Sequence, residues 1–383
     1  MNAPGKTRFG NMNVIPFTSL EVFPRDGEIL IYGAGGQGRY LARLMREYRK
    51  DLRIIGFMDT YKSGSEGDCE IFNLSRLGEM KARHPRALVV VASIYAYQIY
   101  CALLGSVLEE IYVPDPFLVY GHRHSPECGL EKLIAEMPGI SAMFRRKKDR
   151  DFIASVPEFF TFIPDCGPPH RRIMEHHQEL DEQYFDFINK KKIRYAIDGG
   201  MENGSTALRF LHHLPGVRVH GFEPLAAGML ISPLYPFLAG RDDVVINYKA
   251  LSDSSGAAVM KIFSENTGTG YIAEGHVSKY SLDVETVSID DYLATAGIPR
   301  IDYIKLDIES FEINALRGAR QTIARDRPQL AVCLYHRMEH YYEVPKTVFS
   351  LCEDYNYYIG FYGIYTFLET VMYCIPKEID ENE

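Results

Sequence analysis

The chain lacks any long run of apolar residues. No window approaches the ~18 uncharged apolar residues of a membrane-spanning helix, and the amino-terminal segment has no apolar core of signal-peptide length. We therefore expect neither a membrane span nor export. Paired cysteine motifs are also absent: the seven cysteines are widely spaced and form no C-x-x-C pair. This pattern argues against a disulfide framework and a zinc ribbon, and it fits a protein of the reducing cytoplasm.

An excess of basic residues is missing too. With 42 Lys and Arg against 51 Asp and Glu, the formal net charge is -9, which argues against a chain that neutralises a phosphate backbone. One basic run, residues 145–148, is followed by Asp149 and Asp151, and we interpret it as the solvated face of a helix. We expect a small-molecule or carbohydrate substrate as the partner, and neither nucleic acid nor a membrane. The oligomeric state stays open.

The length of the chain predicts more than one domain. Its 383 residues exceed the roughly 250–300 that one hydrophobic core organises. Hydrophobic residues make up 46% and charged residues 24%, which is an ordinary globular composition. We predict an α/β protein with two Rossmann-like domains. A small nucleotide-binding domain occupies residues 1–120, a connector of helices and loops occupies 121–192, and the second domain occupies 193–383.

The first domain opens with a strand, a glycine turn and a helix. The run EILIY begins at Glu28, and the turn after it contains Gly33, Gly35 and Gly38 before the helical stretch GRYLARLMREY. The next apolar run ends in Asp59, about twenty residues beyond the turn. A dinucleotide-binding fold places at that position the acid that holds a ribose hydroxyl. The glycines and Asp59 are therefore our candidate nucleotide site.

Two further apolar runs, residues 87–93 and 109–115, predict more strands of a small parallel sheet. Three interpretations of its glycine turn stay open: a dinucleotide site, a site for another nucleotide such as a nucleotide sugar, and a purely structural turn. Prolines then interrupt residues 120–192 repeatedly. Within this connector, the stretch 171–192 predicts an amphipathic helix that leads into the second domain.

The second domain repeats the pattern of strand, glycine turn and helix. Its first strand ends in Asp198, the turn contains Gly199, Gly200 and Gly204, and the next strand ends in Glu223. S-adenosylmethionine (SAM) carries a ribose diol and a cationic amino-acid tail but no phosphate. An ionised Glu223 can accept hydrogen bonds from both ribose hydroxyls. We expect Asp198 to orient the glycine loop or to meet the amino group of this cofactor.

Four separated blocks resemble the FkbM methyltransferase family and stand in its order: YAIDGGMENGST, HGFEP, INYKALSDSSG and YIKLDIESFEINALRGA. The last block matches the family's lysine, aspartate and glutamate signature at Lys305, Asp307, Glu309, Glu312, Leu316 and Gly318. The resemblance covers residues 194–376. It implies a SAM-dependent O-methyltransferase that acts on a sugar or glycan hydroxyl or on a small natural product. It also implies an open α/β sheet that ends in an antiparallel hairpin.

The same resemblance extends the expected cofactor site. The third block adds Ser252 and Asp253, and the signature adds Asp307. Two departures from the family fall near these loops. Where family members commonly have glycine after the signature glutamate, this chain has Ser310, and the first glycine loop carries the residues 201–203, MEN. Fine cofactor geometry and substrate identity therefore stay open.

O-methylation needs a base that removes the proton of the acceptor hydroxyl. His336, which follows the run LAVCLY, is our candidate, and Asp307 is the second. Each has a structural alternative, because His336 can bond a neighbouring loop and Asp307 can cap the next helix. Asp307, Glu309 and Glu312 could alternatively hold a divalent cation. We assign no metal site, because Glu312 is expected to lie on the following helix.

Tyrosines are frequent after the signature, and Tyr335, Tyr341 and Tyr342 are possible contacts of a sugar ring. Two other functions stay open for the whole chain. An NAD(P)-linked oxidoreductase would use the first glycine turn, although the chain then starts a second cofactor unit instead of a catalytic lobe. A nucleotide-sugar-binding or scaffold protein would keep the methyltransferase domain as an accessory or inactive part.

Overall fold

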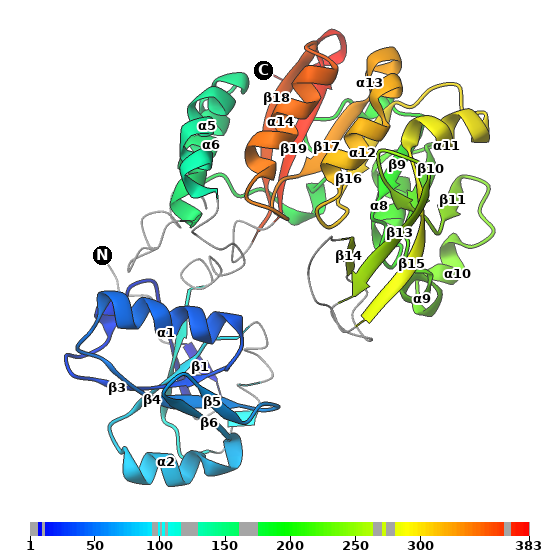
Figure 1. The fold of residues 1–383 in the computed structure, drawn as a ribbon. Helices are drawn as coiled ribbons and strands as arrows, with labels where there is room; N and C mark the ends of the chain where they lie inside the picture. Colours follow the sequence, from blue (N-terminus) through cyan, green and yellow to red (C-terminus); the bar gives the residue numbers. More distant parts are fainter. Residues whose placement is uncertain are drawn as a thin grey trace. The chain divides into compact units, whose positions relative to one another are not determined.

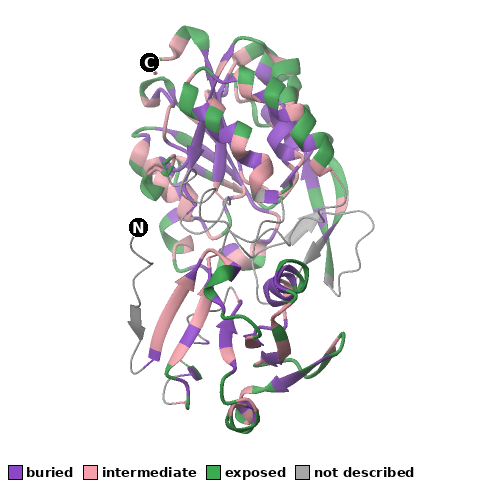
Figure 2. Ribbon diagram, turned by 90° about the vertical axis from the view of Figure 1, so that its left-hand side faces the viewer, coloured by how far each residue is buried: buried purple, intermediate pink, exposed green. Residues whose placement is uncertain are grey.

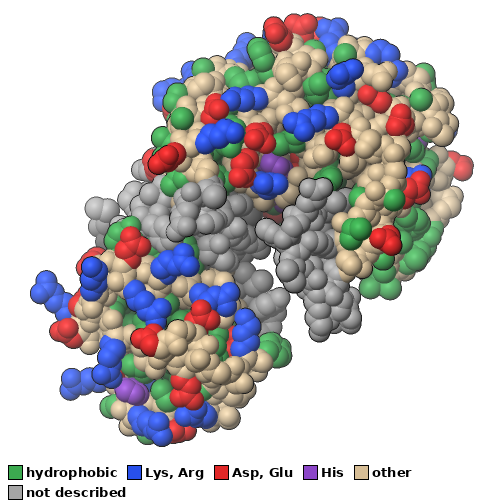
Figure 3. Space-filling model, in the orientation of Figure 1, with side chains coloured by type: hydrophobic (Ala, Val, Ile, Leu, Met, Phe, Trp, Pro, Cys, Tyr) green, Lys and Arg blue, Asp and Glu red, His purple; other side chains and the backbone are tan. Residues whose placement is uncertain are grey.

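The computed structural model describes residues 7–9, 12–93, 99, 102–103, 106–115, 129–160, 175–262, 270–272, 280–363 and 369–382. The contacts divide the chain into two compact units. The first comprises Met1–Leu130, Pro157–Glu175 and Ile364–Phe367, and the second comprises Glu131–Val156, His176–Gly363 and Leu368–Glu383. Each unit has its own sheet and its own hydrophobic core (Figure 1). Basic and acidic side chains are interspersed on the face of each unit drawn in Figure 3.

The first unit is built on an eight-stranded sheet in the order β1-β2-β8-β7-β3-β4-β6-β5. Its strands are β1 (Thr7–Phe9), β2 (Met12–Phe17), β3 (Glu28–Tyr32), β4 (Arg53–Asp59), β5 (Gly64–Glu66), β6 (Cys69–Asn73), β7 (Leu88–Val91) and β8 (Glu110–Pro114). All neighbours pair in parallel except β1 with β2 and β5 with β6. The four strands expected from the apolar runs are confirmed as β3, β4, β7 and β8.

Alternation along β3 explains how this sheet is covered on both faces. Ile29 and Ile31 pack in one cluster with α1 (Gly36–Tyr48), whereas Leu30 and Tyr32 pack in another with α2 (Leu77–Arg83). Successive side chains of a strand point to opposite faces, so a fully apolar strand needs a layer on each side. The two helices lie on opposite sides of the sheet in Figure 1.

The glycine turn of the first unit contains two tightly packed positions and one open one. A Cβ on Gly38 would lie 1.8 Å from the carbonyl oxygen of Gly33, whose own φ is +118°. A Cβ on Gly35, the residue that caps α1, meets no atom within 4 Å. Gly33 and Gly38 are therefore required by the packing of α1 on β3, and Gly35 is not.

We predict that Gly38→Ser lowers the free energy of unfolding by about 2 kcal/mol, because the added Cβ forces the backbone of the turn apart. The matched change Gly35→Ser should alter it by less than about 0.5 kcal/mol, since serine is a good N-cap and the space is open. Urea denaturation of the full chain measures both. Equal destabilisation by the two variants would contradict this account of the turn.

Two helices follow in the connector, α5 (Leu130–Met143) and α6 (Lys147–Phe160). The amphipathic helix expected over 171–192 is wrong for the described residues 175–192. They form turns and two short 3-10 helices, η4 (Leu180–Glu182) and η5 (Lys190–Lys192). Tyr184 and Phe187 take positive φ values of 74° and 60°, which a helix does not allow.

The second unit contains a seven-stranded sheet in the order β11-β10-β9-β16-β17-β19-β18. Its strands are β9 (Tyr195–Gly199), β10 (Arg218–Phe222), β11 (Val244–Asn247), β16 (Tyr303–Leu306), β17 (Gln329–Cys333), β18 (Tyr355–Phe361) and β19 (Thr370–Pro376). The first five in spatial order are parallel, and β19 pairs antiparallel with both β17 and β18. The expected terminal antiparallel hairpin is therefore confirmed; its connection, 364–368, lies outside the described residues.

Helices and a small second sheet complete this unit. The helices are α8 (Ser205–His213), α9 (Ala226–Ile231), α10 (Tyr235–Leu238), α11 (Ile289–Ala296), α12 (Glu312–Gly318), α13 (Arg320–Asp326), α14 (His340–Leu351) and η6 (Lys377–Ile379). The small sheet, in the order β12-β15-β13-β14, contains β12 (Ala250–Leu251), β13 (Gly256–Ile262), β14 (Gly270–Ile272) and β15 (Tyr280–Val287). In Figure 2 the strands of the larger sheet are mostly buried and the helices present exposed faces.

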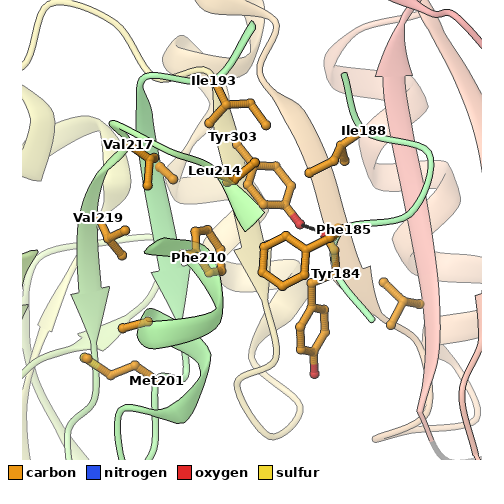
Figure 4. Packing of buried hydrophobic residues seen from close by; sticks show 14 of the residues in the cluster. Tyr184, Phe185, Ile188, Ile193, Met201, Phe210, Leu214, Val217, Val219 and Tyr303 are labelled. Atoms are coloured by element: carbon orange, nitrogen blue, oxygen red, sulfur yellow. Dashed lines mark hydrogen bonds between the residues drawn. The ribbon is translucent and has the colours of Figure 1, made fainter. Parts of the chain in front are cut away.

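The connector segment 175–192 belongs to the core of this unit. Phe185 stacks edge-on against Phe210 of α8 with ring centroids 5.3 Å apart, and Tyr303 of β16 donates a hydrogen bond to the carbonyl oxygen of Tyr184 (Figure 4). Burying each aromatic side chain contributes roughly 1.5–3 kcal/mol. The aromatic side chains of this segment are thus buried although their spacing is not that of a helix. The amphipathic pattern therefore led to a wrong prediction of a helix.

No helix among the described residues combines the length and the apolar character needed to cross a bilayer.

Candidate active site

Four polar residues lie along one edge of the seven-stranded sheet. Strands β10, β9, β16 and β17 are neighbours in that order, and Glu223, Asp198, Asp307 and His336 stand at or just beyond their carboxyl ends. A cavity of about 260 Å³ opens here. Its charged lining residues are Glu202, Glu223, Asp307, Glu309, Glu369 and Lys249. This excess of carboxyl groups favours a cationic ligand.

Lys305 ties the glycine loop to the centre of this edge. Its Nζ donates hydrogen bonds to the carbonyl oxygens of Gly199 and Gly200, at 2.9 and 2.8 Å, and lies 3.2 Å from Asp198 Oδ1. Lys305 and Asp198 are both buried, and burial raises the pKa of Asp198. Asp198 is not among the described residues that line the cavity. These contacts favour the expected role of Asp198 in orienting the loop over a contact with the amino group of the cofactor, and that role stays a prediction.

The glycines of this loop permit close packing. Gly200 has a φ of +79°, and a Cβ there would lie 1.8 Å from the carbonyl oxygen of Asp307. Gly204, with a φ of +90°, would place a Cβ 2.4 Å from Leu238 Cδ1. A side chain at Gly200 would push the loop away from the end of β16, and one at Gly204 would collide with Leu238 of α10. The backbone of Gly200 can therefore border the cavity only as glycine.

Glu223 faces the cavity from the end of β10. Its Oε2 accepts a hydrogen bond from the backbone N–H of Glu202 at 3.1 Å, and its Oε1 accepts one from Leu225 at 2.9 Å. Burial raises the pKa of Glu223 to about 7, although both backbone hydrogen bonds lower it. Each carboxylate oxygen has a further lone pair. The ionised group can therefore still accept hydrogen bonds from a diol.

We predict that SAM binds more tightly as the pH rises through about 7, because only the ionised Glu223 accepts from both ribose hydroxyls. Glu223→Gln should weaken binding by about 1–3 kcal/mol and flatten the pH dependence. Calorimetric titration with SAM on both sides of neutral pH measures this. Glu202→Gln, which changes an acid of the same cavity, should keep the wild-type pH dependence. A wild-type dissociation constant in Glu223→Gln would refute the assignment.

The raised pKa of Glu223 has a second consequence. Unfolding returns the carboxyl to its ordinary pKa, so the folded state binds more protons between the ordinary value and about 7. The group's contribution to stability is thus present below the ordinary pKa and is lost as the pH rises through about 7. Glu223→Gln should remove this part of the pH dependence of thermal unfolding.

The carboxylate of Asp307 is held by three side chains. Tyr184 Oη donates to Oδ2 at 2.7 Å, Tyr335 Oη donates to Oδ1 at 3.0 Å, and His336 Nε2 lies 3.2 Å from Oδ1. Burial would raise the pKa of Asp307, but His336 and the charge of Lys305 outweigh it and hold the pKa well below its usual range. Asp307 therefore stays ionised and is a weak base.

His336 lies between carboxylates. Its Nδ1 is 2.7 Å from Glu312 Oε1, and its Nε2 faces Asp307 Oδ1 at 3.2 Å and Glu309 Oε2 at 3.9 Å. Burial lowers the pKa of His336, but the charges of Glu312 and Asp307 raise it well above the usual value. A protonated imidazole cannot accept a proton. The base function expected for His336 stays a prediction, and these contacts argue against it.

The sequence did not single out Glu369, which lines the same cavity immediately before β19. Its Oε2 accepts a hydrogen bond from Gln183 Nε2 at 2.5 Å, and its φ is +65°. Burial and the charge of Asp307 raise its pKa to about 6. A carboxyl group with such a pKa is suited to accept a proton near neutral pH. A single acid before a strand is too common in sequences to have marked it.

Four other expected residues lie elsewhere. Ser252 is buried and donates a hydrogen bond to Asp253 Oδ1 at 3.3 Å, and Asp253 lines a separate surface cavity. These two residues lie away from the site cavity because β12 ends before Ser252 and the chain then turns into β13. Tyr341 and Tyr342 are buried in α14, whereas Tyr335 does line the site cavity. The positions of these four residues, unlike that of Tyr335, do not support a role in ligand binding in the site cavity.

Two consecutive residues beside the cavity, Glu309 and Ser310, take left-handed backbone conformations, with φ of +51° and +84°. Ser310 stands where the resembling family commonly has glycine. This conformation costs a residue with a Cβ about 1–2 kcal/mol. Ser310 therefore adopts a strained backbone conformation that glycine would adopt without cost.

We predict that Ser310→Gly raises the free energy of unfolding by about 1 kcal/mol, because glycine adopts this conformation without the Cβ contact. Ser350→Gly in α14 is the opposite control and should lower it by about 1 kcal/mol, since its helical backbone disfavours glycine. Urea denaturation of both variants shows whether the free energy of unfolding rises in one and falls in the other. Destabilisation by Ser310→Gly would contradict the strain argument.

In the first unit, the contacts of Asp59 serve the glycine turn. Its Oδ2 accepts from the backbone N–H of Ala34 at 2.9 Å, and its Oδ1 accepts from Tyr61 and Lys62 at 2.9 and 3.0 Å. The bond from Ala34 holds the turn between β3 and α1, and the other two hold the turn that follows β4. The nucleotide site expected at Gly33, Gly35, Gly38 and Asp59 stays a prediction.

The second unit has the architecture of a Rossmann-like methyltransferase: a parallel sheet with a terminal antiparallel hairpin, a glycine loop after β9 and an acid after β10. Residues 198–359 match the model of the methyltransferase FkbM domain. This part of the chain is an FkbM methyltransferase domain.

Two known proteins give further comparison. The 2-O-methyltransferase NoeI of Sinorhizobium fredii (strain NBRC 101917 / NGR234) is 28% identical over 151 residues, which are 34% of this chain and 59% of that protein. The match therefore spans less than two thirds of the relative. The crystal structure of methyltransferase FkbM from Methylobacillus flagellatus KT superposes with a TM-score of 0.59 at 15% identity, covering 91% of this chain and 90% of that one. That likeness is one of fold.

Proposed function

We propose that the protein is a SAM-dependent O-methyltransferase whose acceptor is a sugar or glycan hydroxyl or a hydroxyl of a small natural product. The observation that carries the proposal is that Glu223 and the glycine loop line the same cavity, which is rich in acidic residues, and that the loop donates a backbone hydrogen bond to Glu223. The FkbM domain supplies the methyltransferase class. The relative NoeI is a 2-O-methyltransferase, which supports oxygen as the acceptor atom.

The residues of the cavity fit the cofactor. Glu223 offers acceptor oxygens to a ribose diol, and Gly200 lets the backbone come close without a side chain. Glu202 and Glu309 contribute negative charge beside them, which suits the ammonium and sulfonium groups of SAM. When bound, SAM supplies an electrophilic methyl group on its sulfonium.

Methylation releases the proton of the acceptor hydroxyl, so the cavity must provide a group that takes it. Glu369 fits this role best among the charged residues that line the cavity, because Asp307 is already held by Tyr184 and Tyr335. We therefore place proton acceptance on Glu369. Asp307 keeps a positioning role, since Tyr184 and Tyr335 hold its carboxylate in place beside the cavity.

We expect calorimetry of the full chain to detect one site for SAM and for S-adenosylhomocysteine, with dissociation constants in the micromolar range, about 8 kcal/mol of binding free energy. NAD, NADP and a nucleotide sugar are the comparison ligands in the same buffer. No heat from either methyl-donor ligand at millimolar concentration would sink the proposal. Heat from a nucleotide ligand alone would favour the alternative function of a nucleotide-sugar-binding or NAD(P)-linked protein.

A further inference from the structure

We propose that Asp307, Glu309 and His336 form a binding site for one divalent transition-metal ion, with Mn²⁺ as the reference ion, at the edge of the cavity. The atoms that would coordinate it are close together. His336 Nε2 lies 3.2 Å from Asp307 Oδ1 and 3.9 Å from Glu309 Oε2. Donors that share a cation at about 2.1 Å lie roughly 3 Å apart. Small movements of the exposed Glu309 side chain close the remaining gap.

The ring nitrogen at the centre of this group is buried without a hydrogen bond. The His336 side chain is 5% exposed, and Nε2 has no hydrogen-bond partner in the described part of the chain. Its separation of 3.2 Å from Asp307 Oδ1 is that of an ion pair. A buried polar atom in this state calls for an ion or water.

Glu312 fixes the ring in the state that a metal ligand requires. Its fully buried carboxylate lies with Oε1 2.7 Å from His336 Nδ1, and the same oxygen accepts from the backbone N–H of Ile308 at 2.9 Å. When the metal ion displaces the Nε2 proton, the Nδ1–H donates to Glu312 and the lone pair of Nε2 faces Asp307 and Glu309. Histidines that bind metals almost always donate their other N–H to a carboxylate or carbonyl in this way.

The donor set selects the class of ion. One imidazole nitrogen with two carboxylates suits Mn²⁺ and other first-row divalent ions, whereas Ca²⁺ prefers oxygen donors alone. Asp307 and Glu309 both line the cavity, so the ion would border the space of the acceptor. There it would act as a Lewis acid on a bound hydroxyl or diol. This consequence rests on the proposed function, whereas the binding of the ion does not.

The test is titration of chelator-treated full-length protein with MnCl₂, followed by calorimetry and electron paramagnetic resonance. We expect one Mn²⁺ per chain with a dissociation constant below about 100 µM, and nitrogen modulation from a histidine ligand in the spin-echo spectrum. Asp307→Asn and His336→Gln should each weaken binding roughly tenfold or more. Asp283→Asn, an exposed acid of β15, is the matched control and should leave it unchanged.

Several results would overturn the site. They are absence of Mn²⁺ binding up to about 5 mM, bound Mn²⁺ without nitrogen modulation, and unchanged binding in both variants. The spin-echo measurement on wild-type protein decides even if the variants fail to fold. SAM titration of the metal-free and Mn²⁺-loaded protein separates the two proposals: SAM binding without any Mn²⁺ site refutes only the metal site, and a Mn²⁺ site without SAM binding refutes only the methyltransferase assignment.

Discussion

The buried ammonium of Lys305 organises the site. It bonds to two carbonyl oxygens of the glycine loop and pairs with Asp198, so one side chain of β16 fixes the loop that follows β9. A buried charge is tolerated only when partners surround it, and removal of one partner leaves the other charge uncompensated. The position of the loop, the bend at Gly200 and the approach of Asp307 all depend on this contact.

A second layer of contacts builds outward from that ion pair. Asp307 lies next to the loop and draws Tyr184, Tyr335 and His336 toward it. Glu312 in turn holds His336 from the side of α12. The carboxyl groups that line the cavity thus differ according to their environment: the pKa of Asp307 is held down, while burial holds those of Glu223 and Glu369 up. Neighbouring carboxyl groups with separated pKa values are suited to separate functions.

The sequence was sufficient for the elements with strong periodicity and for residues at strand ends. Asp198, Glu223 and Asp307 could be placed on one edge because parallel strands bring their carboxyl ends together. Glu369 could not be found, since its place beside the cavity depends on the antiparallel insertion of β19. Neither could the contact of Glu312 with His336, which needs the left-handed turn at Glu309 and Ser310. The helix predicted for the segment 175–192 was wrong because its aromatic residues pack individually into the core and do not form one helical face.

That segment also sets how much of the chain the methyltransferase domain requires. Tyr184 precedes residues 198–359 of the family match, yet it bonds to Asp307 and its backbone N–H donates to Tyr373 Oη at 2.8 Å. Glu369 and β19 follow the match, and β19 fills the gap between β17 and β18. A fragment cut at residues 198 and 359 would have an open sheet edge, exposed aromatic residues and an incomplete cavity. The compact unit that carries the site therefore extends at both ends beyond the residues that match the family.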